Sequence, residues 1–230
     1  MIAEGTMAFY FSKPAGYEYQ AGQSFQMTLV DPAPPKVDGR GATREFTIAS
    51  APHEAELMVA MRLRDSAFKD FLKDAPPGTT VTISEADGDL VLHRDPSRPA
   101  VLVAGGIGVT PFLSIVRHAV REALPHPLYL FYSNWRPEVA AFLPELEDMQ
   151  HANPRYRLIA TMTEPEASAQ SWSGETGVIG PELLRRHLPD LTSPIYYLAG
   201  PPTMALAMLD MLQDLGIDDD AIKSAEFYGY

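Results

Sequence analysis

The most informative chemistry in the sequence lies in a glycine-rich turn that follows an apolar run. Glycine lets a backbone approach a ligand closely, and a helix start attracts pyrophosphate through its unpaired N–H groups and the positive end of its dipole. Thr110 can cap the free amides, and Pro111 suits the first helical position. The pattern predicts a dinucleotide-binding turn, with a tight ligand-free turn as the alternative. The residues of this turn are Gly105, Gly106, Ile107, Gly108, Val109, Thr110 and Pro111.

A second turn of the same kind follows the apolar run 195–199 and again leads into a helical pattern. Parallel strands end at the same edge of a sheet, so both turns would open at the carboxyl edge, where dinucleotides lie across the switch point. The predicted contacts in this turn are Gly200, Pro201 and Met204. For Met204, core packing together with Met208 and Met211 is the preferred interpretation.

The segment 44–50 combines a cation, an aromatic ring and hydroxyl groups. Strand alternation would place these groups on one shared face. An arginine there can clamp phosphate oxygens bidentately, and a threonine can hydrogen-bond a ring nitrogen. Taken alone, the same pattern also fits a solvated strand face. The candidate cofactor-binding residues are Arg44, Phe46, Thr47, Ile48 and Ser50.

The first half of the chain must hold that segment in a β-rich domain. Short alternating runs separated by Gly, Pro and Asp predict six strands. These runs are Thr6–Phe11, Gln23–Val30, Arg44–Ser50, Leu57–Leu63, Thr79–Ser84 and Asp89–His93. One helix-like insert is expected at 66–73. Six strands with a single helix favour an antiparallel Greek-key barrel over a parallel sheet, and we assign this barrel to residues 1–96.

The pattern changes after the linker-like segment Asp95–Pro99, because apolar strands now alternate with longer helical patterns. This alternation predicts a parallel-sheet α/β nucleotide-binding domain over residues 97–230. We expect strands at Ala100–Ala104, Leu128–Ser133, Tyr156–Thr161 and Ile195–Ala199. We expect helices at Pro111–Ala123, Pro137–Met149, Pro181–His187 and Thr203–Leu215. The aromatic tail at the end of the chain is expected to be held in place.

Composition excludes several classes of function. The formal net charge of −12 opposes binding to nucleic acid or to anionic lipid. The absence of cysteine rules out disulfides, thiolate zinc sites and cysteine-ligated iron–sulfur clusters. Without a signal-peptide pattern or an apolar run of bilayer length, a cytoplasmic protein with no membrane partner is expected. No metal site is predicted, because metal-ligand spacing is not found among His53, His93, His118, His126, His151 and His187.

Taken in order, the three motifs resemble those of the ferredoxin–NADP reductase superfamily of two-domain flavoprotein reductases. The segment Arg44–Thr47 is similar to the family's Arg-x-Tyr-Ser motif, and residues 105–111 are similar to its glycine-rich strand turn. The segment Ala199–Pro202 resembles its Cys-Gly-Pro-Pro turn, with alanine in place of cysteine. The likeness spans nearly the whole chain and is closest to the compact branch without a fused ferredoxin or oxygenase. It implies FAD and NAD(P)H as cofactors.

The resemblance also implies roles around the flavin. Arg44 would hold flavin phosphate, Phe46 would pack against the isoalloxazine region, and Thr47 would hydrogen-bond near the flavin N5. A family Gly-x-x-Ser motif that contacts pyrophosphate matches residues 66–69 loosely, since serine replaces glycine and lysine replaces serine. The cofactor contacts expected from this region are Arg64, Ser66, Ala67, Phe68 and Lys69.

Family members often place a C-terminal aromatic over the flavin. The candidates here are Phe227, Tyr228 and Tyr230, with Glu226 as a polar neighbour of N5. Thr47, Glu226 and Tyr230 are therefore the candidate catalytic residues, and Phe227 and Tyr230 are candidate flavin contacts. Alternatively, the tail only anchors itself to the domain interface.

The ribose end of the dinucleotide would be read after the strand that ends near residue 133. The expected contacts are Ser133, Asn134 and Arg136. Ser133 and Arg136 could bind a 2′-phosphate, but Trp135 stands where similar sequences often have arginine. The choice between NAD and NADP stays open at this point.

The resemblance implies an NAD(P)H-dependent, FAD-containing reductase. It would pass electrons to an acceptor protein, such as a ferredoxin or an oxygenase component, or to a small acceptor. One alternative is a regulatory or electron-transfer subunit of a larger complex that binds flavin or nucleotide without turnover. A dinucleotide-binding domain joined to an unrelated barrel is the third hypothesis.

Overall fold

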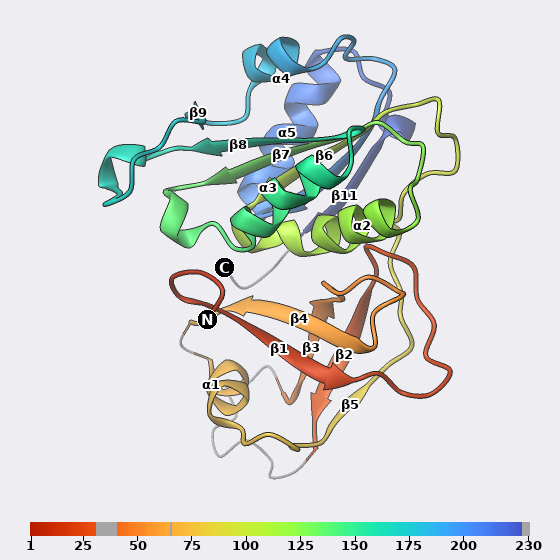
Figure 1. The fold of residues 1–230 in the computed structure, drawn as a ribbon, viewed down its shortest axis with the longest axis vertical. Coiled ribbons are helices and arrows are strands. Elements are labelled where there is room, and N and C mark those ends of the chain that lie inside the picture. The colour runs from red at the N-terminus through yellow and green to blue at the C-terminus, as the bar shows by residue number, and fades with distance from the viewer. Residues whose placement is uncertain (31–40, 65, 227–230) are drawn as a thin grey trace.

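The computed structural model describes residues 1–30, 41–64 and 66–226, and the chain folds into two parts, one above the other in Figure 1. The first part comprises β1 (Thr6–Ser12), β2 (Ser24–Leu29), β3 (Thr43–Thr47), β4 (Glu56–Arg62), α1 (Ala67–Asp74) and β5 (Val81–Ile83). Its strands pair in two antiparallel sheets, one formed by β1 and β4 and the other in the order β3-β2-β5. The first part is therefore an antiparallel β structure with one helix.

The core of the first part follows from strand alternation. Phe25, Met27 and Leu29 occupy every second position of β2, and all three side chains are buried. Helix α1 closes this core with Phe68 and Leu72, which lie one turn apart on its buried face. The apolar period of each element thus determines which face points inward.

The predicted six-stranded barrel is not confirmed, since the described residues of the first part form five strands in separate sheets. The segment predicted as a sixth strand, Asp89–His93, is irregular. Lys223 Nζ donates to the carbonyl oxygens of Asp89 at 3.4 Å and Val91 at 3.2 Å. The N–H of His93 donates to Tyr197 Oη at 2.8 Å. Side chains of the second part thus bond these backbone groups, and the segment connects the two parts.

The second part is a parallel α/β structure, as predicted. Its six strands are β6 (Ala100–Gly105), β7 (Leu128–Asn134), β8 (Tyr156–Met162), β9 (Glu175–Thr176), β10 (Ile195–Gly200) and β11 (Ile222–Glu226). They form one parallel sheet in the order β11-β10-β6-β7-β8-β9. The longer helices are α2 (Thr110–Arg121), α3 (Leu143–Ala152), α4 (Pro181–His187) and α5 (Pro202–Asp214). Short 3-10 turns are η1 (Gly106–Val109), η2 (Pro137–Val139), η3 (Pro165–Ala167) and η4 (Asp219–Ala221).

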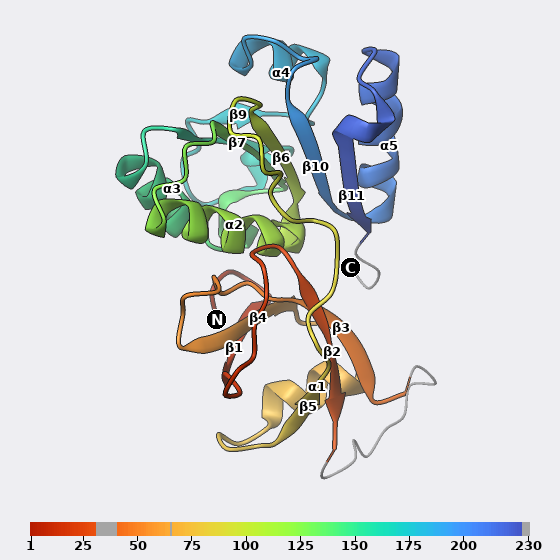
Figure 2. The same cartoon turned by 90° about the vertical axis from the view of Figure 1, so that its right-hand side faces the viewer.

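Helices cover both faces of this sheet, with α2 and α3 on one side and α5 on the other (Figure 2). The four predicted strands and helices are found with small shifts, except that the helix expected at 137–149 is divided. Phe142 adopts a φ of 61°, in the left-handed region, so α3 begins only after it. Strands β9 and β11 are not predicted from the sequence. Within the described ranges, no helix has both the length and the apolar character needed to cross a bilayer.

Helix α2 forms the junction between the two parts and faces the antiparallel sheets in Figure 1. Ser114 Oγ donates to the carbonyl oxygen of Ser50 at 2.6 Å. At Gly22 the backbone comes close to the backbone of Leu90. Glycine is required there, because its φ is 101° and a Cβ would lie 2.2 Å from the carbonyl oxygen of Leu90. A domain boundary between residues 96 and 97 stays a prediction.

Candidate functional site

The site is built where β6 and β10 lie side by side in the sheet. From β6 the chain adds β7, β8 and β9 on one side of the sheet, and it later adds β10 and β11 on the other side of β6. The direction in which strands are added therefore reverses between β6 and β10. Ligands of open α/β sheets bind outside the carboxyl ends of the strands at such a point. The strand register aligns Gly105 with Ser133 and Gly200 with Glu226. Both predicted glycine turns therefore meet at this edge.

The two turns contact each other closely, and at Gly108 the neighbouring backbone leaves no room for a side chain. A Cβ on Gly108 would lie 2.3 Å from the carbonyl oxygen of Ala199, and one on Gly105 would lie 2.4 Å from Met204 Sδ. A Cβ on Gly200 would lie 3.2 Å from the backbone N of Gly105. Met204 therefore packs against the first turn, as the core-packing interpretation requires.

The start of α2 differs from the prediction in one detail. Thr110 does not cap the helix, because its Oγ1 donates to the carbonyl oxygen of Ile107 at 3.0 Å. Gly106–Val109 forms the 3-10 turn η1, and Val109 takes the N-cap position without a side-chain cap. Pro201, at the N-cap of α5, also gives no side-chain cap. Backbone carbonyls take some of the first amides, since the Thr110 N–H bonds to the carbonyl oxygen of Ile107 and the Met204 N–H to that of Pro201 at 2.9 Å. What both helix starts keep is the positive end of the dipole, which favours an anion.

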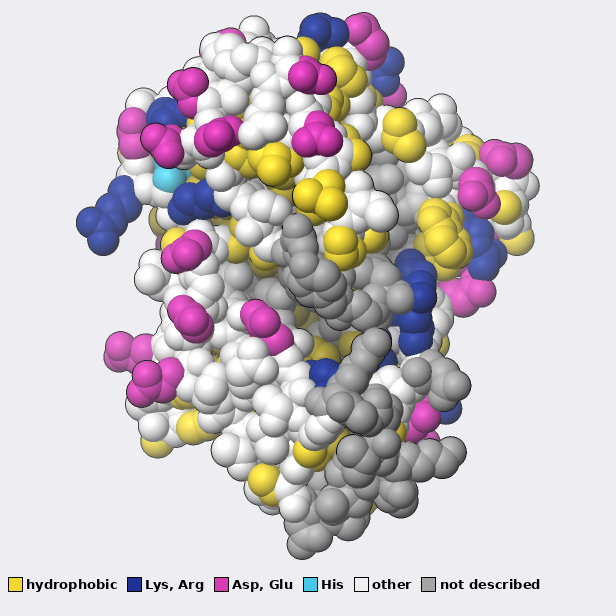
Figure 3. Space-filling view, turned by 180° about the vertical axis from the view of Figure 1, so that it is seen from behind, with side chains coloured by type: hydrophobic (Ala, Val, Ile, Leu, Met, Phe, Trp, Pro, Cys, Tyr) yellow, Lys and Arg dark blue, Asp and Glu magenta, His cyan; other side chains and the backbone are white. Residues whose placement is uncertain are grey.

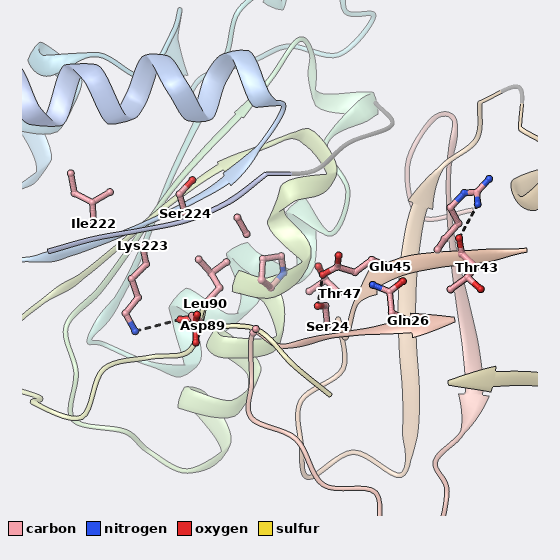
Figure 4. A pocket seen from close by; sticks show the side chains of 15 residues that line it. Ser24, Gln26, Thr43, Glu45, Thr47, Asp89, Leu90, Ile222, Lys223 and Ser224 are labelled. Atoms are coloured by element: carbon pink, nitrogen blue, oxygen red, sulfur yellow. Dashed lines mark hydrogen bonds between the residues drawn. The ribbon is translucent and has the colours of Figure 1, made fainter. Parts of the chain in front are cut away.

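A cavity of about 920 Å³ lies between the antiparallel sheet and β11. Figure 4 shows Ser24, Glu45 and Thr47 on one side of it and Lys223 and Ser224 on the other. Arg44 and Pro111 also line this cavity. Strand β3 and Pro111, at the start of α2, therefore line one shared space, whereas the glycines of the two turns are not among its lining residues. A common cleft for both turns and the arginine-bearing strand stays a prediction.

Strand β3 distributes its functional groups over two faces, so the expected single face is wrong. Arg44 and Phe46 both pack against the ring of Phe68. The Arg44 guanidinium carbon lies 5.3 Å and the Phe46 ring centroid 5.7 Å from the centre of that ring. The side chains of Glu45 and Thr47 occupy the alternate positions of the strand and point to its other face, although Arg44 also lines the cavity with them. Thr47 is only 9% exposed as a residue and lies at the cavity wall.

Ile48 and Ser50 lie beneath the cavity. Ile48 is fully buried in the core of the first part, and its N–H donates to the carbonyl oxygen of Gln23 at 2.9 Å. Ser50 Oγ accepts a bond from the Met58 N–H at 3.0 Å and lies 3.1 Å from Tyr19 Oη. Burial raises the pKa of Tyr19 to about 12, so this phenol stays neutral. Both predicted contacts therefore support the frame of the site.

The region around α1 contributes packing near Arg44. Phe68 is 1% exposed and lies beneath both Arg44 and Phe46. Ser66 takes the N-cap position of α1, Ala67 begins the helix, and Lys69 is half-buried, whereas Arg64 is exposed. Direct contact of these residues with a phosphate stays a prediction.

At the end of β7, the structure pairs the candidate ribose-end cation with an acid that the sequence did not indicate. Arg136 Nη2 lies 2.8 Å from both carboxylate oxygens of Glu4. Asn134 is buried, and its side-chain amide finds no hydrogen-bond partner among the described residues. Ser133 is half-buried, while Trp135 is 58% exposed. No local sequence signal links Glu4 to Arg136, because 132 positions separate them.

Strand β11 is the main part of the site that sequence reasoning missed. It brings Lys223 and Ser224 to the cavity and ends at Glu226 beside Gly200. Lys223 Nζ also lies 5.5 Å from the centre of the Tyr197 ring. The predicted aromatic contacts Phe227, Tyr228 and Tyr230 lie outside the described residues. The apolar pattern of β11 is broken by Lys223 and Ser224, so it gave no clear strand signal.

Comparisons with known proteins agree with this geometry. Residues 102–210 match the family model described as the oxidoreductase NAD-binding domain. One subunit of the Na(+)-translocating NADH-quinone reductase of Methylococcus capsulatus is 26% identical over 204 residues, which is 82% of this chain and 50% of the relative. The corresponding Yersinia pestis protein is 27% identical over 201 residues, with 81% and 49% covered. The chain thus spans about half the length of the curated relatives it matches.

Solved structures share the fold over nearly the whole chain. The flavohem-like FAD/NAD binding domain of nitric oxide dioxygenase from Vibrio cholerae has a TM-score of 0.83 at 18% identity, covering 99% of this chain and 94% of that one. A ferredoxin NADP+ reductase from Neisseria gonorrhoeae with bound FAD and NADP has a TM-score of 0.76 at 22% identity, covering 96% and 92%. The predicted resemblance to ferredoxin–NADP reductases is confirmed at the level of the fold.

The contact between the glycine turns gives a direct test. Gly108→Ala places a methyl group against the carbonyl of Ala199, and we expect a loss of about 1–3 kcal/mol in unfolding free energy. NADH binding should weaken as well, because the two turns must move apart. Denaturant unfolding and NADH titration measure the two effects.

Gly180→Ala is the matched control for this substitution. No atom of the described residues lies within 4 Å of its added Cβ, and its φ of −136° suits any residue. Equal effects of the two substitutions would contradict the steric account of Gly108.

Proposed function

From the match of residues 102–210 to an oxidoreductase NAD-binding domain, we propose that the chain is a flavin-dependent reductase. It passes electrons from NAD(P)H through a bound FAD to an acceptor. The observation that carries the proposal is that Arg44, Thr47 and Pro111, at the start of α2, line one cavity. A cavity of this size is within the range of small-molecule sites, which are commonly about 300–1,000 Å³.

The residues present fit both cofactors. The guanidinium of Arg44 suits a phosphate, and the half-buried strand around it offers the hydroxyls of Ser24, Thr43 and Thr47 to a polar ring. The glycine turns and the uncapped starts of α2 and α5 suit the pyrophosphate of a dinucleotide. The Neisseria gonorrhoeae reductase, which shares the fold, holds FAD and NADP.

The protein's own part in the reaction is positional. A bound flavin supplies hydride acceptance and the onward release of electrons. Arg44 binds phosphate, and Thr47 donates or accepts a hydrogen bond at the ring edge from the cavity wall. Ala199 replaces the family's cysteine, so this position sets only the distance between the rings and adds no thiol. Glu226 and Tyr230 stay predicted participants.

A second candidate function rests on the curated relatives. They are subunits of a Na(+)-translocating NADH-quinone reductase, and this chain spans about half their length. The chain could therefore act as a nucleotide- and flavin-binding subunit without turnover of its own. For the reductase, the proposed acceptor is a ferredoxin, an oxygenase component or a small molecule. A cytoplasmic location stays a prediction. Acidic side chains lie on both parts of the chain in Figure 3, in line with the net charge of −12.

Reduction under anaerobic conditions tests the proposal. The purified protein should be yellow, release FAD on denaturation and lose its flavin absorbance when mixed with NADH. Stopped-flow absorbance at the flavin band measures the rate. A yellow protein that no reduced nicotinamide bleaches would favour the non-turnover subunit. A colourless protein that cannot be reconstituted with FAD would contradict both candidate functions.

The role of Arg44 can be separated from general stability. We expect Arg44→Ala to weaken FAD binding about 10- to 100-fold, because a hydrogen bond to a charged group contributes about 1.5–3 kcal/mol. Titration of the apoprotein with FAD, followed by quenching of flavin fluorescence, measures the change. Arg185→Ala on α4 is the control, since that side chain pairs with Glu182 at the surface of the second part. An unchanged dissociation constant would remove Arg44 from the site.

The pairing of Arg136 with Glu4 favours NADH over NADPH. Glu4 holds the candidate 2′-phosphate ligand through two contacts of 2.8 Å, and its own negative charge repels a phosphate. Ser133 is the remaining predicted contact for that phosphate, and a hydroxyl alone provides no charge. We therefore propose that the enzyme prefers NADH.

Removing this carboxylate should shift the preference. In Glu4→Gln, Arg136 no longer faces a competing anion, and we expect the NADPH-to-NADH ratio of kcat/KM to rise about tenfold, or about 1.4 kcal/mol. Steady-state assays with an artificial acceptor measure the ratio. Glu182→Gln, which removes an equivalent carboxylate beside Arg185, should leave it unchanged. If both variants keep the ratio of the parent protein, Arg136 does not read the ribose.

A further inference from the structure

Two histidines and a glutamate come together where the C-terminal end of α2 meets the first part of the chain. His53 lies in the turn between β3 and β4, while His118 and Glu122 lie on and just after α2. One ligand atom from each residue lies within 4.8 Å of the others. We propose that this cluster is a binding site for a divalent transition metal, with Zn²⁺ as the ion that it fits best.

The spacing of the two residues from α2 is set by helix geometry. His118 and Glu122 are four positions apart, so their side chains lie on the same face one turn apart. The N–H of Glu122 donates to the carbonyl oxygen of His118 at 2.9 Å, which continues the helical turn to Glu122. This pair can therefore bind one ion from a single rigid backbone.

The turn that carries His53 is fixed against the same helix. The N–H of Glu54 donates to the carbonyl oxygen of Ala51 at 3.0 Å, and the Glu54 carboxylate accepts a bond from the Ala51 N–H. Arg117, next to His118, lies 3.3 Å from Glu54 and 2.6 Å from Glu145. This half-buried network of ion pairs therefore holds the turn, and with it His53, beside the helix.

Charge and hydrogen bonding leave the cluster suited to a cation. Glu122 stands at the C-cap of α2, where the helix dipole disfavours a carboxylate. Within the part of the chain that the structure describes, the side chains of His53 and Glu122 form no hydrogen bond or ion pair, and His118 Nδ1 is buried without a partner.

The donor set indicates which metal fits. Two imidazole nitrogens and one carboxylate oxygen suit Zn²⁺, which commonly takes three protein ligands and one water. Ligand atoms around a tetrahedral Zn²⁺ lie roughly 3.4 Å apart, given bonds of about 2.1 Å. The observed upper limit of 4.8 Å requires only side-chain shifts of about 1 Å to close the site. His53 and Glu122 are exposed, so the ion can enter from solvent.

The site is separate from the cavity and joins the two parts. Pro111, which lines the cavity, and Glu122 are eleven positions apart, or about 16 Å along the axis of α2. Because His53 comes from the first part and the other ligands come from α2, a bound ion would link the two parts. It would act as a clasp at the far end of the helix that also begins the dinucleotide site.

Titration with Zn²⁺ tests the site. The full chain with its flavin is freed of metal by a chelator and titrated with ZnCl₂ against a chromophoric zinc indicator. We expect one Zn²⁺ per chain, bound about tenfold or more weakly in each of His53→Ala, His118→Ala and Glu122→Gln. His151→Ala, which removes an exposed histidine from α3, should leave the affinity unchanged. Parent affinity in His53→Ala, or no stoichiometric binding, would overturn the proposal.

The clasp has a second readout that does not depend on activity. Saturating Zn²⁺ should raise the thermal unfolding midpoint of the parent protein and leave that of His53→Ala unchanged, because a ligand stabilises only the state that binds it. Equal circular dichroism and flavin content of the two proteins without metal show that the variant is folded. If Zn²⁺ raised the thermal unfolding midpoint of both proteins by the same amount, the proposal that the ion links the two parts through His53 would be overturned. Neither result depends on electron transfer, so failure of the site is distinct from failure of the proposed function.

Discussion

The contact between two glycine turns is the constraint on which the rest of this structure depends. Gly108 lies against the carbonyl of Ala199 at a distance that admits no side chain, and Gly105 lies against the side chain of Met204. Because β6 and β10 are neighbours at the point where strand order reverses, this contact sets the starts of α2 and α5 beside each other. Two uncapped helix starts at one sheet edge make that edge the natural place for a pyrophosphate.

Helix α2 carries this constraint to the first part of the chain. Its start lines the cavity, Ser114 in its middle bonds the backbone of Ser50, and Arg117 reaches the turn that carries Glu54. Lys223 on β11 forms a second connection, through the carbonyls of the segment between the parts. The cavity therefore has walls from both parts, and its shape depends on polar contacts that only the folded chain brings together.

The features predicted from the sequence are those with a local cause. The glycine turns, the apolar strands of the parallel sheet and the helices each arise from a short run of neighbouring residues. The structure confirms these elements, except that the helix predicted at 137–149 is divided. The prediction of a sixth antiparallel strand is wrong because Asp89–His93 has strand-like composition, but its backbone groups bond Lys223 and Tyr197. Side chains alternate in β3 as in any strand, so Thr47, at an odd position, points to the opposite face from Arg44 and Phe46.

The polar pairs that define the chemistry have no local cause, so the sequence could not show them. Glu4 meets Arg136 across 132 positions, and His53 meets His118 only after the two parts join. Histidine spacing alone also does not indicate Glu122, although a carboxylate four positions after a histidine shares its helix face. The sheet edge that we propose as the nucleotide site can therefore be located from one sequence, because it is formed by backbone geometry. The charge pairs at that edge are formed by side chains that are distant in sequence, so they can be identified only from the folded structure.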